Sequence, residues 1–201
     1  AQWSMLAYQI ANMNAFVGVR HSLRCAMTAS ELKMELDGEV VGTMAHGVTS
    51  MATGLGNFAI GNASFSVEDS FVGWIGQFRW TRALRPDEMG LVMPDRFPIL
   101  SALDPNREKV VLHSHFDGAN NATAATDTTG ASLVFSGGAT LKDTDARFGV
   151  SSLSLNSGSV HRDGIDFSAQ RFTIEFFEKR TENDGVNRYL MSIMDEAGVD
   201  H

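Results

Sequence analysis

Apolar and polar residues alternate along much of the chain with the period of two that is typical of half-buried β-strands. The clearest example is residues 32–36, Leu-Lys-Met-Glu-Leu, where the apolar side chains share one face and the charged ones share the other. Asp37-Gly38 follows directly, and Val40 resumes the apolar character. Because a type I′ turn needs positive φ at its centre, Asp-Gly here predicts a hairpin that pairs 32–36 with 40–44.

Other segments alternate in the same way and predict further strands. In residues 71–81, Val72, Trp74, Phe78 and Trp80 are expected to line one face. The remaining candidates are residues 57–61, 110–116, 133–135, 139–141, 152–155, 172–176 and 189–194. Strands about ten residues apart, with Gly-rich turns and little helix beyond a turn near Pro86, predict an all-β fold of two antiparallel sheets.

A cluster of prolines suggests how the chain is divided. Pro94, Pro98 and Pro105 fall close together, and such clustering of breakers is typical of a connector. We therefore expect a first block at 1–93, a Pro-rich connector at 94–108 and a second block at 109–201. We also expect the chain to be a piece of a longer polypeptide.

Composition excludes some function classes. The net charge is -8, so the basic surface that nucleic-acid binding requires is not expected. No apolar run approaches the roughly 20 residues of a membrane-spanning helix. Cys25 is the single cysteine, which excludes an intrachain disulfide, and we expect it to be a buried apolar residue.

Four segments of the second block form an ordered set of motifs: residues 112–118 (LHSHFDG), 127–130 (DTTG), 147–153 (RFGVSSL) and 172–176 (FTIEF). In this order they resemble the opening half of the laminin-G-like, concanavalin A-like modules found in phage tail and other virion proteins. Residues 32–38, 58–61 and 71–80 resemble the closing half of the same module type. The resemblance implies an antiparallel jelly-roll sandwich, with the chain holding parts of two modules; one circularly permuted sandwich is the alternative.

Residues 35–39 also match the Glu-x-Asp-x-Glu spacing of laminarinase-type glycoside hydrolases, which share this fold. On one continuous strand, Glu35, Asp37 and Glu39 would project three carboxylates to the same face, and two of them could then act as nucleophile and general acid. The Asp37-Gly38 turn would instead put Glu39 on the return strand. We therefore expect a hairpin here and no catalytic residues.

Three further groups are candidates for binding. Asp117 and Asp127 flank a loop at which some resembling modules hold calcium, so calcium is the one cofactor that remains open. His113 and His115 share a strand face and could ligate a metal, although ordinary surface or hydrogen-bonded histidines are the favoured interpretation. Trp74 and Trp80 could stack on sugars, but their shared apolar face favours core packing.

The resemblance implies a non-enzymatic virion component: a tail fibre, a spike or a capsid decoration with lectin-like modules. Its expected partners are other subunits of the particle, as a homo-oligomer, with host surface glycans as candidate ligands that contact residues the sequence does not identify. No nucleic acid and no membrane insertion are expected. A laminarinase-type glycoside hydrolase and a cellular adhesin are the alternatives, because fold alone does not fix function.

Overall fold

The computed structural model describes residues 16–46, 55–61, 71–83, 106–146, 148–166, 171–182 and 190–195, and the structural statements below concern these residues. The fold is all-β, as the alternation predicts. Helix is almost absent from these ranges, where η1 (Arg107–Lys109) is a single 3-10 turn. The turn predicted near Pro86 lies outside them. The strands are β1 (Arg20–Met27), β2 (Glu31–Leu36), β3 (Glu39–Ala45), β4 (Leu55–Ile60), β5 (Gly73–Thr81), β6 (Val110–Ser114), β7 (Ala124–Thr126), β8 (Ser132–Ser136), β9 (Thr140–Lys142), β10 (Ser152–Leu155), β11 (Ser159–Asp166), β12 (Phe172–Arg180) and β13 (Met191–Asp195).

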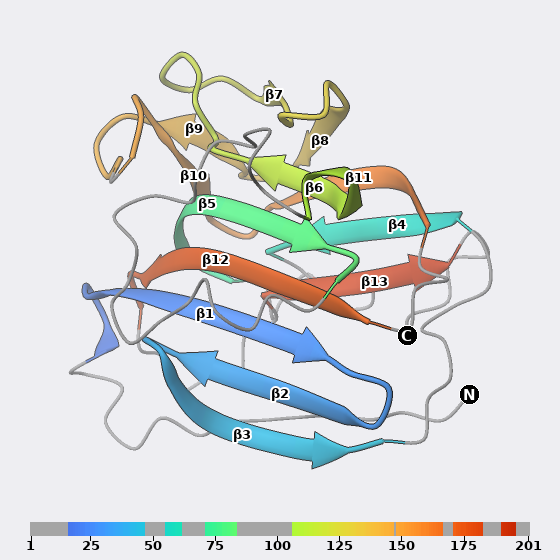
Figure 1. Ribbon diagram of the computed structural model, residues 1–201. Coiled ribbons are helices and arrows are strands. Elements are labelled where there is room, and N and C mark those ends of the chain that lie inside the picture. Colours follow the sequence, from blue (N-terminus) through green and yellow to red (C-terminus); the bar gives the residue numbers. More distant parts are fainter. Residues whose placement is uncertain are drawn as a thin grey trace.

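The strands form two antiparallel sheets that lie against each other as a sandwich (Figure 1). The larger sheet has eight strands in the order β3-β2-β1-β12-β5-β10-β9, with β6 also paired to β5. The smaller sheet has five strands in the order β13-β4-β11-β8-β7. In Figure 1 the larger sheet crosses the front of the molecule, with β4 and β13 behind it.

Each sheet combines strands from both blocks of the sequence. Strand β12, from the second block, lies between β1 and β5, which belong to the first. In the smaller sheet, β4 of the first block lies between β11 and β13 of the second. The expected separation of the two blocks is therefore not found, because strands distant in sequence complete each other's hydrogen bonding. The Pro-rich connector, residues 94–108, lies outside the described residues except for 106–108.

The core lies between the sheets and is rich in aromatic side chains. Phe58 of β4 packs against Phe78 and Trp80 of β5, with ring centroids 5.3 and 4.8 Å apart. Phe176 of β12 stacks on Phe78 at 5.6 Å. Burying each such side chain contributes about 1.5–3 kcal/mol, and these contacts join the smaller sheet to the larger one. Hereafter the face of the larger sheet turned away from this core is called the outer face.

The predicted hairpin is confirmed. Strands β2 and β3 pair antiparallel, with Leu36 opposite Glu39. Asp37 and Gly38 both have positive φ, 51° and 86°, as a type I′ turn requires. The backbone N–H of Asp37 donates to the Ser22 carbonyl, and its carboxylate accepts from the Ser22 N–H, so the turn is also fastened to β1.

The expectation that Trp74 and Trp80 share the apolar face is wrong. In the pairing of β5 with β12, Phe78 lies opposite Phe176 but Ile75 lies opposite Glu178, so the two residues between them on β5 oppose a single residue of β12. This β-bulge reverses the alternation. Ile75, Phe78 and Trp80 face the core, and the half-buried Trp74 faces outward.

Sequence periodicity found most of the strands and missed three. The predicted segments at 57–61, 71–81, 110–116 and 172–176 correspond to β4, β5, β6 and β12, and the shorter candidates correspond to β8, β9, β10 and β13. The missed strands are β1, β7 and β11. Strands β1 and β11 carry arginines among their apolar residues, and β7 is formed by Ala and Thr, so none of them presents a clear apolar stripe.

Replacing Gly73 by alanine is expected to destabilise the protein by roughly 3 kcal/mol or more. Gly73 has φ 155°, and a Cβ there would lie 2.3 Å from the Lys179 carbonyl oxygen on the adjacent strand. The matched control is Gly76→Ala in the same strand, where a Cβ would lie 3.8 Å from Phe148. Urea unfolding should place this control within about 1 kcal/mol of wild type; equal losses for both variants would contradict the explanation.

Candidate functional site

A shallow depression opens on the outer face where β5 begins and β12 ends. The register aligns three side chains across neighbouring strands: Arg20 of β1 is opposite Lys179 of β12, which is opposite Trp74 of β5. Gly76 and Phe177 complete the floor, and Asp145, from the segment between β9 and β10, forms a wall. This set of residues is called the Trp74 depression below. It exists because the bulge in β5 turns Trp74 outward.

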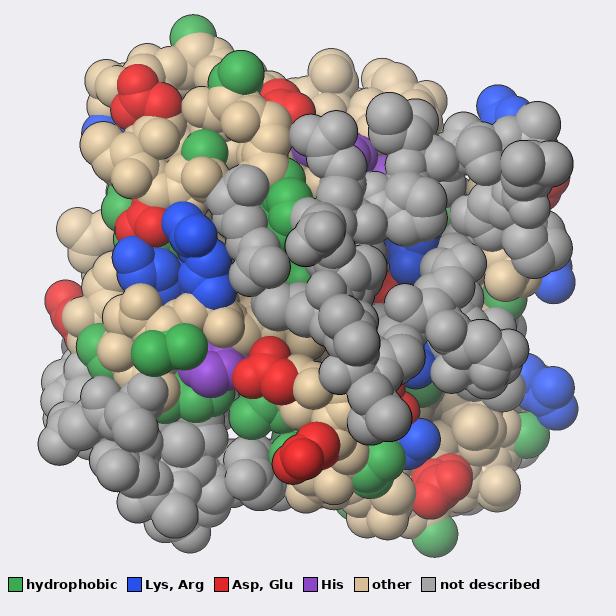
Figure 2. Space-filling view, turned by 60° about the vertical axis from the view of Figure 1, so that its left-hand side comes forward, with side chains coloured by type: hydrophobic (Ala, Val, Ile, Leu, Met, Phe, Trp, Pro, Cys, Tyr) green, Lys and Arg blue, Asp and Glu red, His purple; other side chains and the backbone are tan. Residues whose placement is uncertain are grey.

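Asp145 organises the charges of the depression. Its carboxylate accepts a hydrogen bond from Arg20 Nη2 at 2.9 Å. It also accepts two from Lys179 Nζ, at 2.8 and 3.0 Å. A single carboxylate thus holds two cations in fixed positions next to an indole ring. In Figure 2, which brings this side of the molecule forward, Lys and Arg side chains gather beside acidic ones.

The apolar part of the depression rests on a small second cluster of buried residues. Phe177 packs against Phe148 with ring centroids 5.0 Å apart, on the side of the sheet away from the main core. Phe148 also lies beside Gly76 of β5, where an added Cβ would be 3.8 Å from its ring. Hydrogen-bond donors beside an aromatic face suit a sugar ring.

The sequence did not point to this site. Trp74 was a candidate for sugar stacking, but the regular alternation assigned it to the core. Arg20, Lys179 and Asp145 carry no motif, and they meet only in the folded sheet, with Asp145 lying 125 residues from Arg20 and 34 residues from Lys179. The Gly76-Gln77 pair at the bulge is the one local signal, since glycine within a strand often marks such a feature.

A row of buried charges crosses the middle of the outer face. Arg24 of β1 lies between Glu35 of β2 and Glu175 of β12, and Glu175 is in turn opposite Arg79 of β5. Arg79 donates from Nε and Nη2 to Glu175 Oε2 at 2.8 and 2.6 Å. Arg24 Nη1 donates to Glu35 Oε2 at 3.1 Å. All four side chains are buried, so we interpret this charge row as structural.

The carboxylates of the glycosidase-like motif lie apart. Glu35 is on β2 and is held by Arg24 and Lys33 in the charge row. Asp37 is at the turn, where its Oδ2 lies 2.6 Å from His21 Nδ1. Glu39 begins β3 and is exposed. The predicted hairpin therefore separates these residues, and they do not form a row of three on one strand.

His113 and His115 share the outer face, as predicted, with ring centroids 4.7 Å apart. His113 is opposite Arg79, at the end of the charge row. The His115 Nδ1 lies 2.9 Å from the Gln77 amide nitrogen. Within the described parts of the chain, no three His, Cys, Asp or Glu side chains are grouped as a metal ion would need.

Asp117 and Asp127 each have local partners. Asp117 accepts a hydrogen bond from the backbone N–H of Val150 at 2.8 Å. Asp127 Oδ1 accepts from the backbone N–H of Thr129 and of Ala131, which is ordinary turn chemistry, and Arg162 Nε lies 3.6 Å from Oδ2. The neighbouring guanidinium does not favour a cation at Asp127. Calcium binding by this pair stays a prediction that these contacts do not support.

A second polar cluster lies at the end of the inner face. Glu178 is buried opposite His21, and its Oε2 lies 3.6 Å from Arg180 Nε. Burial raises the pKa of Glu178 above its ordinary value of 4.5, an effect that the charges of Arg180 and His21 partly oppose. His21 also stacks on Phe16, with centroids 3.7 Å apart.

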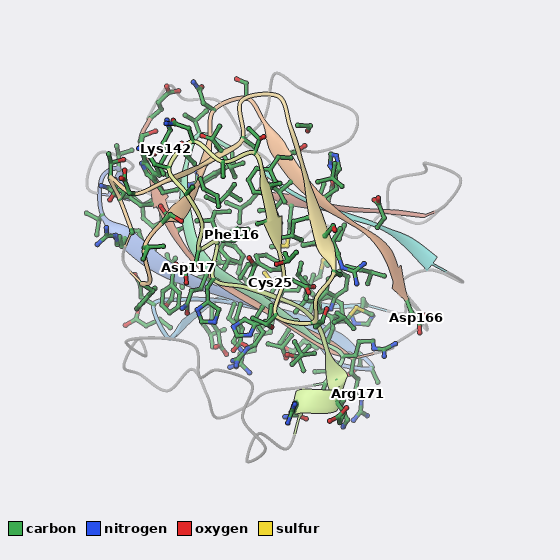
Figure 3. All side chains as sticks on the ribbon, turned by 90° about the horizontal axis from the view of Figure 1, so that it is seen from above. Cys25, Phe116, Asp117, Lys142, Asp166 and Arg171 are labelled. Atoms are coloured by element: carbon green, nitrogen blue, oxygen red, sulfur yellow. The ribbon has the colours of Figure 1, made fainter. Side chains whose placement is uncertain are left out.

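Cys25 lies on the inner face and packs against the core as an apolar residue, but it is partly buried and not fully buried as predicted. Burial raises the pKa of its thiol to about 12. At neutral pH the thiol is therefore protonated and is a poor nucleophile. Figure 3 shows Cys25 near the middle of the molecule, far from the peripheral Lys142 and Arg171.

Comparison with known proteins does not assign a family. No family model, no curated protein and no solved structure matches this chain. The resemblance to laminin-G-like modules stays a prediction from the sequence. Among the described residues, none forms a helix that is long and apolar enough to cross a bilayer.

Replacing Glu175 by alanine is expected to cost about 3–5 kcal/mol of unfolding free energy, because Arg79 would keep a buried and uncompensated charge. The control is Arg82→Ala, which removes an ion pair to Asp166 at the same kind of distance, 2.8 Å, but with both side chains partly exposed. That variant should lose less than about 1 kcal/mol. Similar losses in chemical denaturation would show that burial does not determine the effect.

Replacing Glu178 by glutamine is expected to change how stability depends on pH. Because the pKa of Glu178 is raised on folding, the folded protein binds this proton more tightly, and stability falls as pH rises from about 4.5 through the folded pKa. The variant should lack this decline and should gain stability relative to wild type at neutral pH. The free energy of unfolding is measured by urea titration at pH values from about 4 to about 8, which enclose that window. Glu39→Gln, at an exposed site, is the control. Identical pH profiles for E178Q and wild type would refute the prediction.

Proposed function

We propose that this chain is a non-catalytic, lectin-like β-sandwich module of a virion component, which binds host surface glycans at the Trp74 depression. The observation that carries the proposal is the outward Trp74 beside a fixed group of hydrogen-bonding side chains. An indole offers a flat apolar face, and Arg and Lys donate hydrogen bonds to hydroxyl or anionic oxygens. Together they suit a ligand with one apolar face and many polar edges, as a pyranose has.

The proposed architecture is one concanavalin A-like jelly-roll sandwich with a permuted strand order. Support comes from the pairing of β12 with both β1 and β5, which draws the opening-half and closing-half motifs into one sheet. Parts of two separate modules would instead leave apolar faces and strand edges for other polypeptide to cover. The shared core of the two sheets favours the single sandwich.

The assignment to a virus particle rests on the resemblance of the four second-block motifs to modules of phage tail and other virion proteins. A tail fibre, spike or capsid decoration is the proposed location. Other subunits of the particle, in a homo-oligomer, are the proposed partners, since most such components assemble symmetrically. A cellular adhesin built from the same module would use the same depression and differs only in its setting.

A laminarinase-type hydrolase is the second candidate, because that family shares the proposed fold. It needs two carboxylates about 5–5.5 Å apart across the scissile bond for retention. Glu35 is held in the buried charge row and Glu39 is on the return strand, so this motif gives the candidate little support. Binding without hydrolysis is therefore preferred.

The test is a glycan array with the 201-residue protein, followed by a reducing-sugar assay on each glycan bound. We expect binding without sugar release. Trp74→Ala should lower affinity at least about tenfold, and Trp74→Phe, which keeps an aromatic face, should retain most of it. Val134→Ala removes an exposed apolar side chain on β8 of the smaller sheet and is the control. Sugar release, or full binding by Trp74→Ala with unchanged thermal unfolding, would overturn the proposal.

A further inference from the structure

We propose that the Trp74 depression selects saccharides that carry an acidic group, with the anion paired to Arg20 and Lys179 while a sugar ring stacks on Trp74. This inference rests on the proposed glycan-binding function and names its ligand class. It follows from the charge, the unused donors and the spacing of the residues in the depression.

The charged side chains on the outer face of the depression differ in sign from the chain as a whole. The four charged residues of the lining sum to zero, but the three on the outer face, Arg20, Lys179 and Asp145, sum to +1 in a chain that carries -8. Glu178, which also borders it, projects to the inner face and pairs with Arg180. A surplus cation in a concave site attracts anions.

Both cations keep donors for a ligand. Arg20 bonds to Asp145 through Nη2 alone, and its side chain is 36% exposed, so Nε and Nη1 are available. Lys179 gives two hydrogen bonds to Asp145, and an ammonium group has three donors. Asp145 thus fixes both side chains in position and occupies Nη2 of Arg20, while Nε and Nη1 of Arg20 and one N–H of Lys179 remain to donate to a carboxylate or sulfate.

The spacing of the strands determines how far the acidic group of a ligand must lie from the ring that stacks on Trp74. Neighbouring strands lie about 4.8 Å apart, so Lys179 is one step from Trp74 and Arg20 is two steps, or about 10 Å, away. An acidic group on the stacked ring itself would reach Lys179. An acidic group on the next ring would reach Arg20, so the site fits an acidic disaccharide better than a single neutral sugar.

The test compares matched sugars on the full chain: N-acetyllactosamine, its sialylated form and its sulfated form, measured by calorimetry at low salt. We expect the two acidic forms to bind at least about tenfold more tightly than the neutral one, with the difference shrinking as salt rises. A preference for the sialylated form identifies carboxylate as the recognised group, and a preference for the sulfated form identifies sulfate.

Variants separate charge from structure. Arg20→Gln should abolish the preference for acidic sugars while retaining binding of the neutral one. Arg20→Lys, which keeps the charge and loses the planar fork, should retain part of that preference. Asp145→Asn keeps a side-chain oxygen that can accept from Arg20 or Lys179 and removes the competing negative charge, so it should increase affinity for acidic sugars. Thermal unfolding of each variant checks that the fold is intact.

The outcomes distinguish the two proposals. Equal binding of neutral and acidic sugars, with a loss in Trp74→Ala, overturns the acidic preference and leaves glycan binding standing. An acidic preference that survives in Arg20→Gln and in Lys179→Gln assigns recognition to another surface and also overturns the inference. Failure of every array glycan to bind overturns both proposals.

Discussion

Strand β12 is the element on which the sandwich depends, because it pairs along its length with β1 on one side and β5 on the other. Its inner face supplies Phe172, Ile174 and Phe176 to the core. Its outer face carries Glu175, the carboxylate between the arginines of β1 and β5. The three strands are thus joined by backbone hydrogen bonds, by apolar packing on one face and by paired charges on the other.

Burying that charge row has two consequences. A paired carboxylate and guanidinium in a buried setting contribute little to net stability, yet removing either one leaves a costly uncompensated charge. The row therefore favours one register over its neighbours, since a slip of one residue would turn the charges into the core. Because Glu175 alternates with Phe and Ile side chains, only one register of β12 keeps the carboxylate on the outer face and the apolar side chains in the core.

The bulge in β5 connects this rigid centre to the candidate site. With regular alternation, Trp74 would enter the core beside Trp80 and the outer face would have no indole. The extra residue reverses the direction of Trp74, which then lies opposite Lys179 and next in line to Arg20. Gly73 is the first residue of the strand. Its positive φ and its short distance to the Lys179 carbonyl leave no room for a side chain. Local irregularity at the start of one strand thus creates the surface to which we assign ligand binding.

Several features followed from the sequence alone. Alternation in residues 32–36 and 172–176 identified strands, because a half-buried sheet needs apolar residues at every second position. Asp37-Gly38 identified its hairpin, because few dipeptides tolerate positive φ at both positions. The same turn predicted that Glu35 and Glu39 would be separated. Cys25 was expected to be apolar, and it packs against the core.

The tertiary structure decided the rest. Arg20, Asp145 and Lys179 are ordinary surface residues in the sequence, and they form a site only because β1 pairs with β12 and the segment before β10 reaches the same place. Strand β1 was missed because its arginines are buried by partners from β2 and β12, which no local window contains. The direction of Trp74 depends on a bulge whose position is fixed by the register against β12. Periodicity reports local preference, whereas partner strand, register and bulge are set by contacts between residues that lie far apart along the chain.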